Sequence, residues 1–137
     1  GGFPKDINLI QAHKSMAYAS RALKPGGVMV LLAECRDGYG NATFFNWFGY
    51  ETCTELESAL RKHYEINGQT AWSVKEKAER FRIVLVSVLP DEEVRTMGMV
   101  PATTLDAALD VARPMLPEQF KAYVIPAGGT VLPVLKT

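Results

Sequence analysis

The sequence predicts an α/β fold, namely a mostly parallel sheet of about four strands with helices on both faces. Short apolar runs without polar alternation are typical of strands that are covered on both sides. Segments with helical periodicity separate these runs, and proline and glycine clusters mark the boundaries. The length of 137 residues suits one domain, so we expect residues 1–137 to form a single domain.

Four strands are expected, at residues 28–33, 83–88, 99–100 and 122–125. Because helical segments of ten or more residues separate them, the pattern favours parallel pairing with right-handed crossovers. Sites in such sheets form beyond the carboxyl ends of the strands. That rule directs attention to residues 34–41, 88–91 and 126–129.

The first helix is expected over residues 7–23, with Asp6 as its N-cap. A short helix with aromatic side chains follows at residues 43–48. A capping box that starts at either Thr52 or Thr54 would begin the next helix, which ends near residue 64.

Three further helices complete the pattern. Residues 71–81 show helical spacing, Asp91 is placed to cap a short helix that ends at Gly98, and Thr103 is placed to cap the last one. The inward residues of that last helix are expected to be Leu105, Ala108, Leu109 and Ala112. Residues 129–135 form a tail that pairs at a sheet edge or docks on a neighbour.

The composition argues against several partners. Lys and Arg number 15 and Asp and Glu number 15, so the net charge is zero and a nucleic-acid partner is not expected. No apolar run approaches the roughly 20 residues of a membrane span, so no membrane partner is expected. Cys35 and Cys53 form no CxxC pair and no cluster with either histidine. We therefore expect reduced thiols, no metal site and a cytoplasmic location.

One helix face offers candidate binding residues. Gln11, Lys14 and Tyr18 are spaced i, i+3 and i+7, opposite the apolar stripe of the same helix. The ammonium of Lys14 and the amide of Gln11 could together hold a carboxylate. By spacing alone, a solvated outer face is the favoured interpretation.

Other polar residues have open or structural interpretations. His13 lies on the apolar stripe, so a partly buried, hydrogen-bonded structural histidine is favoured over a catalytic base. Glu34, Arg36 and Asp37 follow the first strand. They form either a structural ion-pair cluster or a wall of a cleft.

The start of the chain resembles a known family. Residues 2–14 read GFPKDINLIQAHK. This run is similar to the pattern that opens the C-terminal domain of the nickel-dependent lactate racemase family, a glycine, one residue and proline before Asp-x-Asn-Leu-Tyr-Gln-x-x-Lys. The resemblance continues at residues 24–27, 33–38, 86–89 and 97–99, and the chain begins without methionine. It therefore resembles the C-terminal domain of a larger two-domain enzyme.

The resemblance implies a 2-hydroxy acid racemase or epimerase whose active site lies between the two domains. In the family, the N-terminal domain carries the nickel pincer nucleotide cofactor, its attachment lysine, its nickel-ligating histidine and two acid/base histidines. The cofactor takes a hydride from the 2-hydroxy acid and returns it to either face of the keto acid. No catalytic residue is then expected in this chain, which would be inert alone. The family's substrate-holding glutamine and lysine match Gln11 and Lys14.

The sequence also departs from the family pattern. The tyrosine before the glutamine is Ile10 here, which puts lactate in doubt as the particular substrate. A looser match at residues 68–72 places Trp72 where a family tryptophan closes the substrate pocket. Trp72 also lies off the apolar stripe of its helix, so simple core packing is not expected. We expect an exposed apolar patch where the N-terminal domain docks, which includes some of the rings of Phe44, Trp47 and Trp72.

Two other function classes stay open. Residues 21–31 resemble the helix–turn–strand in the middle of S-adenosylmethionine-dependent methyltransferases, but any α/β protein can use such a Pro-Gly-Gly turn. A non-catalytic α/β ligand-binding module is the third class, because the chain itself lacks the cofactor lysine and paired histidines that the resemblance requires.

Overall fold

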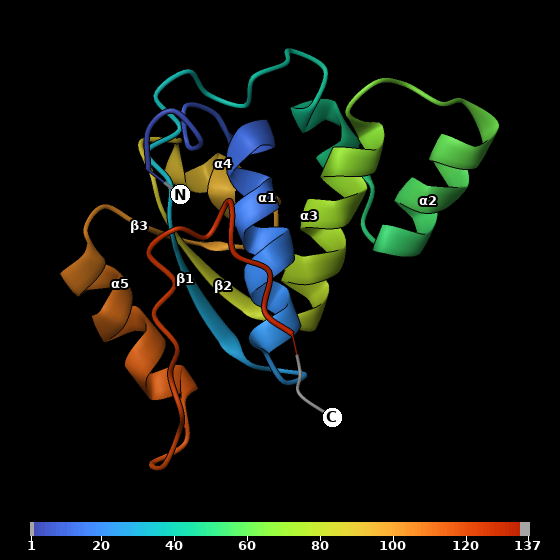
Figure 1. Ribbon diagram of the computed structural model, residues 1–137. Helices are drawn as coiled ribbons and strands as arrows, with labels where there is room; N and C mark the ends of the chain where they lie inside the picture. The colour runs from blue at the N-terminus through green and yellow to red at the C-terminus, as the bar shows by residue number, and fades with distance from the viewer. Residues whose placement is uncertain (1, 135–137) are drawn as a thin grey trace.

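The computed structural model describes residues 2–134. Its centre is a parallel sheet of three strands in the order β1-β2-β3, with β1 at Val28–Leu32, β2 at Arg82–Val86 and β3 at Val100–Ala102. Successive side chains of these strands point to opposite faces. Both faces carry helices, as Figure 1 shows. The predicted α/β class with a parallel sheet is therefore confirmed.

The expected fourth strand is wrong. Residues 122–125 have no regular secondary structure, and Tyr123 and Val124 are 72% and 89% exposed. An inner strand of such a sheet needs cover on both faces, which these side chains lack. Residues 129–134 of the expected tail are not a strand either, and residue 135 lies outside the described residues.

The larger core lies between one face of the sheet and two helices, α1 (Leu9–Ala19) and α3 (Gly68–Arg80). Met29, Leu31, Ile83 and Leu85 point into it from the strands. Helix α2 (Cys53–Lys62) packs on α3, and a 3₁₀ helix, η2 (Phe45–Gly49), also contacts α3. Helices α1 and α3 both begin at the end of the sheet where the strands finish (Figure 1).

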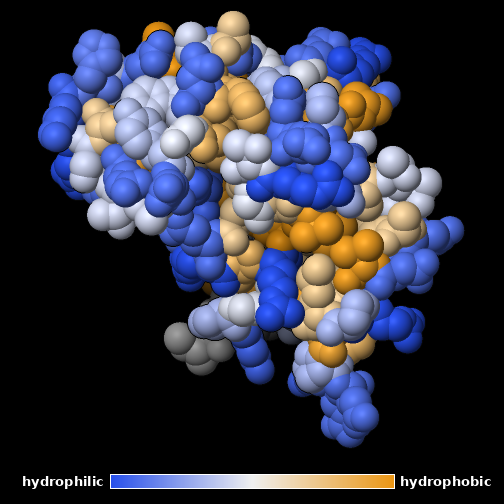
Figure 2. Space-filling model, turned by 180° about the vertical axis from the view of Figure 1, so that it is seen from behind, coloured by the Kyte–Doolittle hydropathy of each residue, from blue (hydrophilic) through white to orange (hydrophobic). Residues whose placement is uncertain are grey.

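Helix α5 (Leu105–Ala112) covers the opposite face of the sheet and contacts all three strands. Ala108 and Ala112 are buried against the strands, whereas Leu105 and Leu109 are 45% and 50% exposed. The prediction that both leucines point inward is wrong, because the small alanines form the contact and the leucines flank it. Figure 2 shows an apolar area on the face opposite to the view of Figure 1.

Several helix starts differ from the expected ones. Asn8, not Asp6, caps α1, which gives way to a 3₁₀ turn at Ser20–Ala22. Asp6 is buried, and its carbonyl accepts a hydrogen bond from the Cys35 N–H at 2.8 Å. At α5 the cap is Thr104 instead of Thr103.

The other starts follow the sequence more closely. Thr52 and Glu55 form the capping box of α2, which settles the choice between the two expected boxes. The expected cap of α4 (Asp91–Thr96) is wrong, because Pro90 occupies the N-cap position and Asp91 is the first helical residue. The helix also ends at Thr96, before the expected Gly98. Cys35 and Cys53 are buried free thiols.

Candidate functional site

The outer face of α1 brings Gln11 and Lys14 together. Both side chains are exposed, and Lys14 Nζ donates a hydrogen bond to Gln11 Oε1 at 2.9 Å. Tyr18 lies on the same face one turn further along and is also partly open to solvent. The structure thus joins two of the three predicted binding residues into one polar pair.

This pair offers hydrogen-bond donors and no free carboxylate. The Lys14 ammonium keeps two N–H groups after its bond to Gln11, and the Gln11 amide nitrogen keeps both of its own. Within residues 2–134, Lys14 makes no salt bridge to an acidic side chain. A donor array of this kind suits a carboxylate, because a charge-assisted bond from an ammonium is stronger than a bond between neutral groups.

The loop that follows β1 fixes the start of α1. The Leu9 N–H donates to the Gly38 carbonyl at 3.0 Å, and the Ile10 N–H donates to the Tyr39 carbonyl at 3.1 Å. The Gln11 N–H donates to Asn8 Oδ1 at 2.9 Å. These bonds hold the first turn of the helix, and therefore the base of the Gln11 side chain, in one place.

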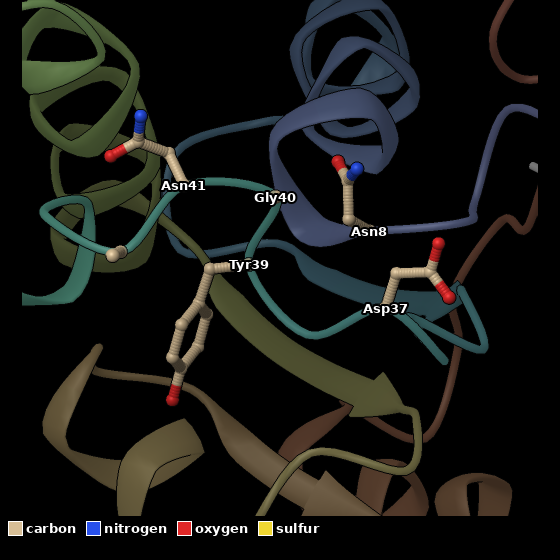
Figure 3. Close-up of a pocket in the computed structure, with 6 residues that line it drawn as sticks. Asn8, Asp37, Tyr39, Gly40 and Asn41 are labelled. Carbon is tan, nitrogen blue, oxygen red and sulfur yellow. The ribbon is translucent and has the colours of Figure 1, made fainter.

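Gly40 lies directly against the capping side chain, beside an open pocket whose lining residues include Asn8, Asp37, Tyr39 and Asn41 (Figure 3). Gly40 has a φ of +90°, and a Cβ there would lie 2.5 Å from Asn8 Cγ. Only glycine fits this close approach without displacing the cap. The sequence signal for Asn8 was its spacing of three residues before Gln11, as in a capping box.

The backbone donors of the first three helical residues of α1 are all hydrogen-bonded. The Leu9, Ile10 and Gln11 N–H groups bond as described above, and the Ala12 N–H makes the first ordinary helix bond, to the Asn8 carbonyl at 3.0 Å. The N–H groups of Leu9, Ile10 and Gln11 are therefore not available to an anion.

Tyr39 ties the same loop to α4. Its hydroxyl donates to the Glu93 carboxylate, and its ring stacks on Phe45 at 5.2 Å between centroids. Burial raises the pKa of Tyr39 above its ordinary value, and the bond to Glu93 raises it further. The phenol stays protonated and serves as a structural donor.

The charged residues Arg36 and Asp37 follow β1. Their positions agree with both interpretations that the sequence left open, namely a structural ion pair and the wall of a cleft. Arg36 and Asp37 lie 3.9 Å apart as an exposed ion pair, and the Arg36 guanidinium lies over the Phe3 ring. Asp37 also lines the pocket beside Asn8. The ion pair between Arg36 and Asp37 is exposed and therefore contributes little to the stability of the fold.

Trp72 is half-buried on α3 and packs against the larger core. Its indole Nε1 is buried and has no hydrogen-bond partner in the described structure. Trp72 is thus partly buried at the border of the core and is not one of its buried members, which agrees with the expectation that it is not simple core packing. A role in substrate binding stays a prediction.

The other expected residues are structural. His13 is half-buried, and its Nδ1 lies 2.5 Å from the Ile10 carbonyl oxygen, as predicted for a hydrogen-bonded structural histidine. Phe44 and Trp47 are buried in the core, so the expected docking patch does not include their rings.

Within residues 2–134, no group of three or more His, Cys, Asp and Glu side chains could hold a metal ion. Over the same residues, no helix has both the length and the apolar character of a membrane span.

Comparison with known proteins gives consistent matches. Residues 1–133 match the family described as the lactate racemase C-terminal domain. Lactate racemases from Thermoanaerobacterium thermosaccharolyticum and Lactiplantibacillus plantarum are 30% and 32% identical to the chain, each over 96% of its length. The chain spans 32% of each of these relatives.

A solved structure agrees. The lactate racemase apoprotein from Thermoanaerobacterium thermosaccharolyticum superimposes with a TM-score of 0.86 at 30% identity, over 96% of this chain and 33% of that one. The family match also covers the turn at residues 24–27 that had suggested a methyltransferase, and so accounts for it. The chain belongs to the lactate racemase C-terminal domain family.

Proposed function

We propose that this chain is the substrate-holding domain of a 2-hydroxy acid racemase or epimerase. The observation that carries the proposal is the hydrogen-bonded pair of Gln11 and Lys14 on the exposed face of α1. Family membership supports the reaction class, since the two relatives named above are lactate racemases. Because the chain spans about a third of their length, the complete reaction is assigned to a longer polypeptide.

In this proposal, Lys14 and Gln11 hold the carboxylate of the substrate. Loss of hydride from C2, together with the hydroxyl proton, leaves a 2-keto acid whose carbonyl carbon is planar. Return of the hydride to the opposite face, with a proton to oxygen, gives the other stereoisomer. A carboxylate anchored by charge-assisted bonds keeps the intermediate in place while either face is presented.

The described residues do not fit the cofactor that the family resemblance implies. No cluster of potential metal ligands exists within residues 2–134, and no step of the proposal is routed through the metal. We assign the nickel pincer nucleotide, with its hydride chemistry, to an N-terminal partner domain. The proposed substrate class is 2-hydroxy acids and is not narrowed to lactate, because Ile10 replaces the family's tyrosine.

The test is racemisation by the full-length polypeptide that carries this domain. Lys14→Ala removes a charged contact and is expected to lower kcat/KM by about tenfold to a hundredfold. Gln11→Ala is expected to lower it less, because a neutral amide binds a carboxylate more weakly. Both residues are exposed, so both variants are expected to unfold at nearly the wild-type temperature.

Leu9→Ala is the matched control on the same helix. Leu9 is fully buried, so this variant is expected to lose about 2–4 kcal/mol of stability. Wild-type kcat/KM in Lys14→Ala with the true substrate would contradict the anchor role. Racemisation by the isolated 137-residue chain, supplied with the nickel cofactor, would contradict the assignment of the chemistry to the partner domain.

A further inference from the structure

Residues 119–134 cross the surface of the domain as a segment that we call the C-terminal strap. The strap contains no helix and no strand. Its hydrogen bonds within the described residues are local, since the N–H groups of Thr130 and Val131 donate to the Ala127 carbonyl at 2.9 and 3.2 Å. Figure 1 shows the strap in front of α5 and α1. Packing, and not hydrogen bonding, therefore holds the strap on the domain.

Two glycines of the strap pack against α1. Gly128 is buried, and a Cβ there would lie 3.2 Å from Ser15 Cβ. A Cβ on Gly129 would lie 3.4 Å from Ser15 Oγ. Ser15 is only 3% exposed, although Gln11, one turn before it on the same side of the helix, is open to solvent. The strap therefore covers α1 directly beside the Gln11–Lys14 pair.

The strap carries large apolar side chains that the domain leaves uncovered. Tyr123, Val124 and Val134 are 72%, 89% and 76% exposed. The other exposed apolar residues of the strap are Phe120, Val131 and Leu132. The segment has a single charged residue, Lys121. Exposed apolar side chains that gather in one segment are typical of a surface that binds another protein surface, so we expect a partner with an apolar surface.

The position of the strap identifies that partner. In the proposed function an N-terminal domain precedes this chain, which spans 32% of each lactate racemase relative. Lys5, near the start of the chain, lies against the strap, since a Cβ on Gly129 would lie 3.1 Å from Lys5 Cδ. The N-terminal domain therefore joins the chain beside the strap. It must also approach the Gln11–Lys14 pair, which the strap borders.

We propose that the C-terminal strap is the contact surface for the N-terminal domain of the same polypeptide. Its exposed apolar side chains pack on an apolar surface of that domain, and their removal from water favours the contact. The docked strap then borders the site that holds the substrate. This inference rests on the proposed function, because the N-terminal domain is the partner.

The test is limited trypsin digestion of the full-length polypeptide and of the 137-residue chain. Lys121 is exposed, and residues 114–134 contain no other Lys or Arg, so cleavage after Lys121 reports on the strap. We expect this cleavage to be about tenfold slower in the full-length polypeptide, because a docked segment must open before a protease cuts it. Cleavage after the exposed Lys62, at the end of α2 and away from the strap, gives the reference rate (Figure 1). An unchanged ratio of the two rates would overturn the proposal.

Matched variants of the full-length polypeptide locate the contact. Val124→Ser and Ile66→Ser each replace an apolar side chain that this domain leaves 89% and 71% exposed. We expect Val124→Ser to speed cleavage after Lys121 by several-fold, because it removes a side chain from the contact, and Ile66→Ser to leave the rate unchanged. Equal rates in the two variants would overturn the proposal.

Two further outcomes are distinguishable. Protection of Lys121 in the 137-residue chain that rises with protein concentration would assign the strap to a second copy, and would also overturn the proposal. Trypsin digestion does not measure racemisation, so a failure of the anchor role in Lys14→Ala is detected separately from a failure of the strap to dock.

Discussion

Helices α1 and α3 lie side by side on one face of the sheet and begin at the same edge, but their first turns differ (Figure 1). The loop after β1 and the Asn8 side chain accept hydrogen bonds from the Leu9, Ile10 and Gln11 N–H groups of α1. At the start of α3, two backbone donors remain unpaired. The difference shows that the loop after β1 completes the first turn of α1, whereas no such loop contact completes the first turn of α3 in the described structure.

Gly40→Ala is expected to disturb α1 most. A Cβ at this position would collide with the Asn8 cap, and alanine is strained at a φ of +90°. We expect a loss of about 2 kcal/mol in the free energy of unfolding, measured by urea denaturation.

Gly38→Ala is the matched control in the same loop. Gly38 also has a positive φ, of +68°, but a Cβ there would contact nothing within 4 Å. The strain alone is expected to cost about 1 kcal/mol. Equal losses in the two variants would show that the contact between Gly40 and Asn8 does not support the cap.

The caps themselves give the next largest effect. Asn8→Ala removes the side-chain oxygen that accepts the Gln11 N–H and is expected to cost about 1 kcal/mol. Asn67→Gly at the start of α3 is expected to leave stability nearly unchanged, because Asn67 caps nothing and glycine accepts its left-handed conformation. Thermal unfolding of the two variants checks the comparison, and a larger loss in Asn67→Gly would reverse it.

The smallest effect is a pH dependence carried by His13. Burial lowers the pKa of His13, its bond to the Ile10 carbonyl raises it, and the ammonium groups of Lys14 and Lys77 lower it further, with a net decrease from 6.5. The unfolded chain therefore binds this proton at higher pH than the folded chain does. Stability is expected to fall as the pH drops below about 6.5.

Urea denaturation at several pH values between 5 and 7.5 measures this dependence. His13→Asn is expected to show a weaker loss of stability at low pH than the wild type. If the stability of His13→Asn depends on pH as that of the wild type does, His13 is not the source of the pH dependence.

Local patterns in the sequence predicted much of the fold. The apolar runs at residues 28–33 and 83–88 became the two longer strands, and Thr52 began a capping box, because burial and capping depend on near neighbours. Residues 122–125 had an apolar strand pattern too, but whether they pair depends on cover from other elements. The apolar pattern of residues 122–125 does not by itself indicate whether other elements of the fold cover them.

Local spacing in the sequence also predicted part of the candidate site, the pair of Gln11 and Lys14. The i, i+3 spacing placed Gln11 beside Lys14, and the structure joins them by a hydrogen bond. The contacts that distinguish the two helix starts are instead long-range, between Asn8 and Gly40 and between Trp47 and Gly68. No pattern within a single helix contains these pairs, so they become visible only when the chain is folded.

Amide hydrogen exchange of the 137-residue chain tests the central claim most directly, namely that the N–H groups of the first three residues of α1 are hydrogen-bonded, whereas those of Gln69 and Thr70 in α3 are not. We predict slow exchange for Leu9, Ile10 and Gln11, whose N–H groups are bonded, and fast exchange for Gln69, whose N–H group is unpaired and whose side chain is exposed. Gln69 protection equal to that of the three α1 amides would contradict the account.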